Sequence, residues 1–149
     1  MSEPLNPSRD LPALTGEHPI SLRPDALPYM STIPDDHPDR ETLIHAALTG
    51  SQPTTLDAVG ATIKVANVVV SVGEYADELS GEIRYARRIV MISPDGAMTT
   101  STSDSVWRSL RVAASLFGPP PWQPPREFRI VQHSSKRGPR KYITLELIP

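Results

Sequence analysis

The chain has 149 residues, 17 prolines, no cysteine and a formal net charge of −2 at pH 7. Its length fits one domain, and a proline content about twice the usual ~5% excludes a mostly helical bundle, because interior prolines break helical hydrogen bonds. The absence of cysteine excludes disulfide scaffolds, thiolate zinc sites and thiol nucleophiles. Neither a signal peptide nor an apolar run of roughly 18 residues occurs, so we expect a soluble intracellular protein.

The N-terminal part is acidic and rich in proline. Residues 1–60 carry nine acids and three bases, a net charge of −6, whereas residues 61–149 carry eight acids and twelve bases, a net charge of +4. Nine of the prolines lie within residues 1–53, and this segment shows no sustained period of 2 or 3.6. We predict that residues 1–55 form a proline-rich acidic arm, of which 1–38 has no fold of its own unless it packs on the body or on a partner.

One short helix is predicted within the arm, over residues 40–48. Its apolar residues fall on one helical stripe, formed by Leu43, Ile44, Ala47 and Leu48. Asp39 is the candidate N-cap and Gly50 the candidate stop. A helix this short is marginal alone, so we expect the stripe to dock on the body of the protein.

The body, residues 56–149, is predicted to contain five strands and one helix. The strands are expected at 61–72, 83–92, 97–101, 127–133 and 141–148, and the helix at about 104–117. The apolar phase changes within the first strand, which indicates a bulge or sharp bend near Ala66 and Asn67. The helix has N-cap candidates in Thr102, Ser103 and Asp104, ends at Gly118, and buries a stripe of Val106, Leu110, Ala113 and Phe117.

This order of elements is typical of the OB-fold, a small five-stranded Greek-key barrel. We therefore predict a mainly β protein whose residues 56–149 form a five-stranded OB-like barrel, with one helix between strands 3 and 4. The proline-rich arm and the short helix precede this barrel. An α+β sandwich remains the alternative architecture.

Residues suited to catalysis or metal binding are sparse. The histidines stand at positions 18, 37, 45 and 133, without the spacing of a metal-ligand pair. Asp35, Asp36 and Asp39 lie beside prolines and Arg40, which favours a solvated charged arm with a helix cap. No phosphate-binding glycine loop or nucleophile elbow occurs. We predict that the protein is no enzyme and holds neither a cofactor nor a metal.

Two groups of basic and aromatic residues point to nucleic acid instead. The first lies at the turn between the last two strands and contains Lys136, Arg137, Arg140, Lys141 and Tyr142. In an OB barrel this loop is one of the two that bind oligonucleotides. Cations there can follow a phosphate backbone, and the tyrosine offers a stacking face. The alternative is an ordinary polar hairpin tip.

The second group lies on the strand 83–92 and contains Arg84, Tyr85, Arg87 and Arg88. Alternation places Arg84 and Arg88 on one face and Tyr85 and Arg87 on the other, and the sequence leaves open which face is buried. The alternative is a set of cross-strand ion pairs.

Trp107 and Trp122 are read as packing residues, because a protein with few aromatics needs them in its core.

The stretch 56–148 resembles the small single-stranded DNA-binding proteins encoded by phages and plasmids. The similarity rests on patterns of apolar residues and turns rather than on catalytic motifs. These patterns are Leu56–Gly60, Arg88–Gly96, the helix Ser103–Gly118, and the closing hairpin Phe128–Gln132 with Gly138–Leu145. The proline-rich arm departs from the usual arrangement of that group. The resemblance implies an OB-fold protein that coats exposed strands during replication, has no catalytic residues, and acts in the cytoplasm of a bacterial host.

Together these observations predict binding of single-stranded DNA without sequence preference, in replication or recombination. The predicted binding residues are Arg84, Tyr85, Arg87, Arg88, Lys136, Arg137, Arg140, Lys141 and Tyr142. The alternative is a structural or assembly protein, such as a virion or scaffold subunit, whose arm wraps a neighbour in a homo-oligomer. A metal-dependent nuclease with scattered acidic ligands is a third hypothesis. No membrane partner is expected.

Overall fold

The structure, a computed structural model, describes residues 29–76, 79–134 and 141–149, with the backbone alone at 73–76 and 83–85. These residues form β1 (Tyr29–Ser31), α2 (Arg40–Thr49), β2 (Thr62–Val65), β3 (Asn67–Ala76), β4 (Ile83–Ile92), β5 (Met98–Ser101), α3 (Asp104–Phe117), β6 (Arg126–Ser134) and β7 (Lys141–Ile148). The strands make two antiparallel sheets, β1-β3-β4-β5 and β2-β6-β7. The prediction of a mainly β protein is confirmed.

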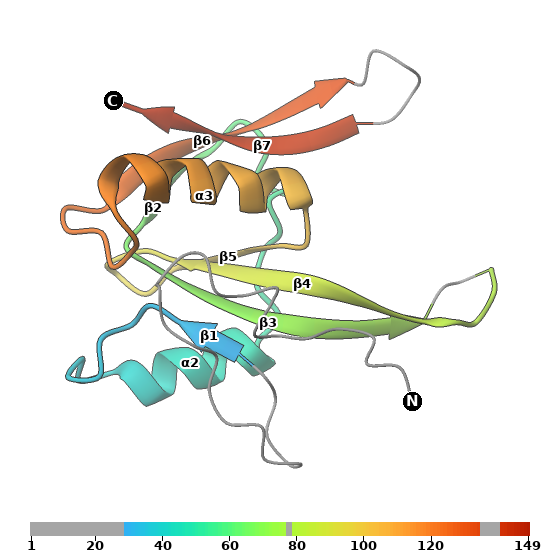
Figure 1. The fold of residues 1–149 in the computed structure, drawn as a ribbon, viewed down its shortest axis with the longest axis horizontal. Helices are drawn as coiled ribbons and strands as arrows, with labels where there is room; N and C mark the ends of the chain where they lie inside the picture. The colour runs from blue at the N-terminus through green and yellow to red at the C-terminus, as the bar shows by residue number, and fades with distance from the viewer. Residues whose placement is uncertain (1–28, 77–78, 135–140) are drawn as a thin grey trace.

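Helix α3 lies between the two sheets (Figure 1). Ser103 caps it by accepting hydrogen bonds from the amides of Ser105 and Val106. The helix buries Val106, Trp107, Leu110 and Ala113 in one cluster with residues of both sheets, among them Val70, Ile89, Phe128 and Leu145. The predicted bounds of the helix are therefore confirmed, and its apolar face joins the sheets into one core.

The prediction that Phe117 belongs to the buried stripe of α3 is wrong. Its side chain is 39% exposed, because the last turn of the helix extends beyond the buried cluster. The Arg126 guanidinium covers the ring instead, with its carbon 3.8 Å from the ring centroid. A cation over an aromatic face is favourable even where the ring is partly solvated.

The long first strand expected at 61–72 bends where its apolar phase changes. The break falls at Ala66, so that β2 joins one sheet and β3 the other. The Ala66 amide donates to the Ile92 carbonyl, 2.8 Å away, and the Trp122 amide donates to the Ala66 carbonyl, also 2.8 Å away. The strand also runs to Ala76, past the predicted end, because it pairs with β4 in unbroken register from Asn67–Ile92 to Ala76–Ile83.

The prediction of a closed barrel is wrong, whereas the five strands predicted for the body correspond to β2 with β3, β4, β5, β6 and β7. The described residues form seven strands in two separate sheets, and no strand pairing among them joins β5 to β7. The free edge of β5 is occupied by the chain before it, since the Thr55 amide donates to the Thr100 carbonyl and the Thr100 amide to the Pro53 carbonyl.

The free edge of β7 is met by side chains of α3 and its cap rather than by a strand. Ser103 Oγ donates to the Ile143 carbonyl across 3.4 Å, and the Leu145 amide donates to Ser109 Oγ across 3.1 Å. Two serines thus satisfy backbone groups that strand pairing would otherwise satisfy. The sheet therefore stays open along this side.

The segment before β2 packs on the outer face of the first sheet. Strand β1 pairs with β3 from Tyr29–Ser71 to Ser31–Val69, so this part of the predicted arm packs on the body, as the prediction for residues 1–38 allowed. Residues 1–28 of the predicted arm lie outside the described residues. In α2, Ile44 and Ala47 are buried against Val69, Val90 and Ile92, as the stripe predicted.

The two ends of α2 match the predictions unequally. Gly50 ends the helix as expected, and its amide donates to the Ala46 carbonyl across 2.8 Å. Asp39 makes no side-chain cap bond, because its backbone lies at φ −104° and ψ 14° rather than in the extended region of an N-cap. Its amide instead donates to His37 Nδ1, 3.0 Å away.

Neither α2 nor α3 is long and apolar enough to cross a membrane. The division of the chain between residues 55 and 56 into an arm and a body stays a prediction.

Candidate nucleic-acid interface

Arg87 and Arg88 are neighbours in β4 and face opposite sides of the sheet. Arg88 lies on the side of α2, where its guanidinium donates to the carbonyl oxygens of Ala47 and Gly50 and to Gln52 Oε1. Burial lowers the pKa of Arg88. Its positive charge satisfies carbonyls at the C-terminal end of α2, a favourable position for a cation. The side chain therefore fixes α2 to the sheet.

Arg87 lies on the other side of β4, against α3. Its guanidinium carbon is 4.4 Å from the ring centroid of Trp107. Its Nη1 is 3.6 Å from an Asp104 carboxylate oxygen, and the Asp104 side chain is 98% exposed. A solvated carboxylate interacts weakly with its partner, while the indole holds the guanidinium in place. Arg87 is thus a positioned cation beside the start of α3.

Lys141 and Tyr142 lie at the start of β7, and both are exposed. Tyr142 is 45% exposed, and its ring stacks on His133 of β6 with centroids 5.0 Å apart and planes 17° from parallel. His133 Nε2 is in turn 2.8 Å from Thr144 Oγ1. These contacts hold the tyrosine ring in one orientation with part of its surface open to solvent. Such a ring can receive an unpaired base.

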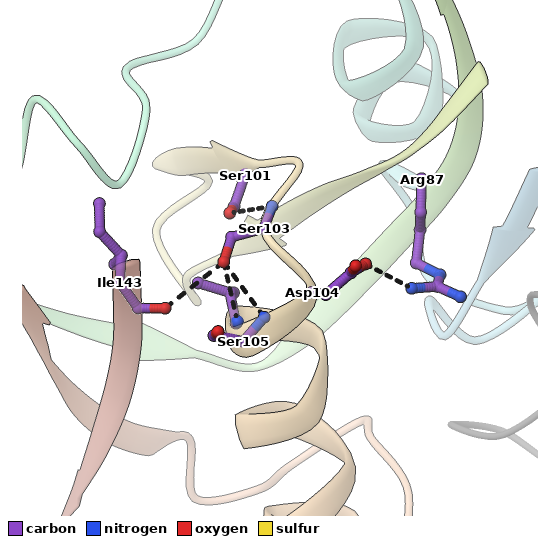
Figure 2. Close-up of polar contacts among 7 residues, drawn as sticks. Arg87, Ser101, Ser103, Asp104, Ser105 and Ile143 are labelled. Carbon is purple, nitrogen blue, oxygen red and sulfur yellow. Dashed lines mark hydrogen bonds and ion pairs between the residues drawn. The ribbon is translucent and has the colours of Figure 1, made fainter. Parts of the chain in front are cut away.

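The first residues of α3 bring these two regions together. Figure 2 shows Ser103 bonded to the Ile143 carbonyl on one side, while the adjacent Asp104 reaches Arg87 on the other. Tyr142 directly precedes Ile143. The start of β7 and the middle of β4 therefore both contact the start of α3, although they are more than 50 residues apart in sequence. Alternation places the Tyr142 ring on the face of β7 opposite that of the buried Ile143.

Part of the predicted site lies beyond what the structure describes. Lys136, Arg137 and Arg140 fall in the loop between β6 and β7, outside the described residues. Arg84 and Tyr85 stand in β4, opposite Tyr75 and Glu74 of β3, and their side chains are also outside the description. Their roles stay predictions.

Sequence reasoning missed three residues of this region. Arg108 and Arg111 line a groove of about 580 Å³ that also includes Arg87 and Trp107. Their spacing on the predicted helix, on the turn that carries Trp107, was the available signal. His133 was seen only as a hairpin histidine, and its pairing with Tyr142 depends on the register of β6 and β7. Trp107 and Trp122 are 6% and 4% exposed, which confirms their reading as packing residues.

The comparisons agree with the resemblance noted from the sequence. The model of a family described as phage single-stranded DNA-binding protein, of the Phi29 type, matches residues 29–148. The match begins at β1 and ends with β7, so it includes every strand and helix that the structure describes. No matching curated protein and no matching solved structure was found.

Replacement of Arg88 should destabilise the protein. In Arg88→Ala the carbonyls of Ala47 and Gly50 no longer have their charged donor, and hydrogen bonds to charged groups are worth about 1.5–3 kcal/mol each. Because they are not additive, we expect a total loss of about 2–4 kcal/mol in the free energy of unfolding. Urea denaturation measures this loss. The exposed Arg108→Ala should change stability by less than about 0.5 kcal/mol, and equal effects of the two variants would contradict the assigned role of Arg88.

Proposed function

The chain belongs to the family of phage single-stranded DNA-binding proteins, and from this membership and the geometry above we propose that it binds single-stranded DNA without sequence preference. The observation that carries the proposal is the part-exposed ring of Tyr142, which His133 holds in one orientation. Arg87, held over Trp107 of α3, supplies a positioned cation. Its role would be to coat strands exposed during replication or recombination.

The strand pairing supports an open variant of the OB-fold. Pairings β3–β4 and β4–β5 in one sheet, and β2–β6 and β6–β7 in the other, are those of a five-stranded OB barrel whose bent first strand is β2 plus β3. The pairing of β5 with β7 is replaced by the contacts of Ser103 and Ser109 with β7. In OB proteins the ligand runs between the β3–β4 and β6–β7 loops of this chain's numbering.

Phosphate groups would be neutralised by cations on both sides of that path. Arg87 of β4 and Lys141 of β7 are the described members, and Arg84, Lys136, Arg137 and Arg140 extend the set toward the two loops. Such contacts release counterions and carry no sequence information. Arg88 would support DNA binding only indirectly, by holding α2 on the sheet, because its N–H groups donate to carbonyls at the end of α2.

Bases would stack on tyrosine rather than be read through their edges. A π face is common to every base, so stacking on Tyr142, and on Tyr85 as predicted, is tolerant of sequence. His133 acts as a positioning residue, because it supports one face of the Tyr142 ring while the exposed part stays accessible. Single strands are favoured over duplexes because only unpaired bases can be splayed onto a ring.

Titration of fluorescent oligonucleotides tests the proposal. We expect binding of single strands regardless of sequence, much weaker binding of duplexes, and a linear fall of log affinity with log salt of about 0.7 per phosphate contact. An affinity for single strands that does not respond to salt, or equal affinity for single strands and duplexes, would rule out the proposed mode of binding.

The Tyr142 ring can be tested separately from its hydroxyl. Removal of a stacking ring costs about 1–3 kcal/mol per base, so Tyr142→Ala should weaken binding by roughly 5- to 150-fold. Tyr142→Phe keeps the ring and should bind nearly as the parent protein does. The side chain is exposed, so both variants should fold, which circular dichroism checks. If Tyr142→Ala binds as tightly as the parent, no base stacks on this ring.

A further inference from the structure

The outward face of α3 forms one wall of the groove described above. The groove has a volume of about 580 Å³ and is lined by Arg87 from β4 and by Asp104, Trp107, Arg108, Arg111 and Val112 from α3. Arg108 and Arg111 are exposed, and Val112 is 53% exposed. None of the residues predicted from the sequence to bind DNA, except Arg87, belongs to this groove.

The charge of the groove is strongly unbalanced. Three of its side chains are arginines, and its one acid, Asp104, contacts Arg87. Arg108 and Arg111 form no salt bridge or hydrogen bond with any side chain in the described parts of the chain. They lie about 4.5 Å apart along the helix axis, from a rise of about 1.5 Å per residue. The groove therefore presents two adjacent guanidinium groups that can meet an extended anion.

The position of the groove favours a nucleic-acid backbone as that anion. It begins at Asp104 and Arg87, one residue from Ser103, whose hydroxyl reaches the strand that carries Tyr142. β7 is the edge strand of its sheet, and its free edge faces α3. The Tyr142 ring lies on the face of β7 opposite Ile143 and Leu145, which pack with α3. A strand stacked on this ring can therefore reach α3 and its arginines by crossing the edge of β7. Val112 adds an exposed apolar surface beside the arginines.

We propose that this groove binds the phosphodiester backbone of the same single-stranded DNA, with Arg108 and Arg111 as phosphate contacts. The inference rests on the proposed function and extends its binding surface from the strands onto the helix. Residues 104 to 115 span about 16 Å of helix, and at about 3.4 Å per nucleotide of stacked strand this length holds about five nucleotides. The groove therefore adds about five nucleotides to the length of DNA that one protein binds.

The double variant Arg108→Ala with Arg111→Ala tests this extension against a control of equal charge change. The control is Lys64→Ala with Arg129→Ala, which removes two exposed cations of β2 and β6 that do not line the groove. Oligothymidylates of about 6 to 30 nucleotides are titrated by fluorescence anisotropy at about 50 and 200 mM salt, a range over which phosphate contacts weaken measurably. Urea denaturation confirms that each variant is folded.

The double variant should bind the shortest oligonucleotides as the parent protein does and bind the longer ones more weakly. Because the variant cannot neutralise two of the phosphates, the slope of log affinity against log salt on long strands falls by about 1.4. The ratio of the parent's affinity to the variant's affinity for long strands should therefore fall by about sevenfold when salt rises fourfold. The control keeps the parent slope and the parent dependence on length.

Three outcomes would overturn the inference. If the double variant and the control lose affinity equally, the loss reflects the change in net charge, and the groove makes no specific contribution to DNA binding. If the double variant binds all lengths as the parent does, the groove is outside the DNA path and fits an acidic protein segment instead; the proposed function then still stands. If the parent protein binds no single-stranded DNA, the proposed function fails first, and this inference fails with it.

Discussion

The burial of one face of α3 between the two sheets is the interaction on which the rest of the structure depends. Val106, Trp107, Leu110 and Ala113 pack against residues of both sheets at once. Burial of a large apolar side chain contributes about 1.5–3 kcal/mol, so this single face supplies much of the adhesion between sheets that share no strand pairing. The start of the helix also contacts one strand of each sheet, β4 through Asp104 and β7 through Ser103.

The open side of the sheets follows from the same packing. In a closed barrel β5 and β7 would pair with each other. Here Ser103 and Ser109 form hydrogen bonds with backbone groups at the edge of β7, and the Pro53–Thr55 backbone does so at the edge of β5. Helix α3 lies at the seam between the sheets, with β7 on one side and β5 and β4 on the other (Figure 1), and its Arg108, Arg111 and Val112 are exposed. Arg87 of β4 and Arg108 and Arg111 of α3 thus line one groove, and the free edge of β7, the strand that carries Tyr142, faces the same helix.

The sequence was sufficient for the elements that local signals specify. The Gly118 stop and the bend near Ala66 each have a local physical cause, and the structure places them as predicted. The helix cap is Ser103, one of the three predicted candidates. Closure of the barrel was predicted wrongly, because it depends on which groups meet the edges of β5 and β7. Those partners are far away in sequence and carry no pattern.

The candidate site, too, was predictable from local patterns only in part. Lys141 and Tyr142 were predicted to bind DNA because they lie at the basic end of the last hairpin, and the structure shows both exposed. The separation of Arg87 from Arg88 followed from alternation, but the engagement of Arg88 with α2 did not, because it depends on where the end of that helix docks. The contribution of α3 was missed because its arginines look like ordinary solvated helix residues until Arg87 is placed beside them.

The most direct test of the account is to map bound DNA on the folded protein. In nuclear magnetic resonance spectra of the ¹⁵N-labelled protein, added oligothymidylate should shift the amide signals of Arg87, of Tyr142 and of the first two turns of α3. The signals of the outward face of α2 should stay unchanged. Shifts confined to α2 and β1, with none along α3 and β7, would contradict the claim that the single strand follows the seam between the sheets.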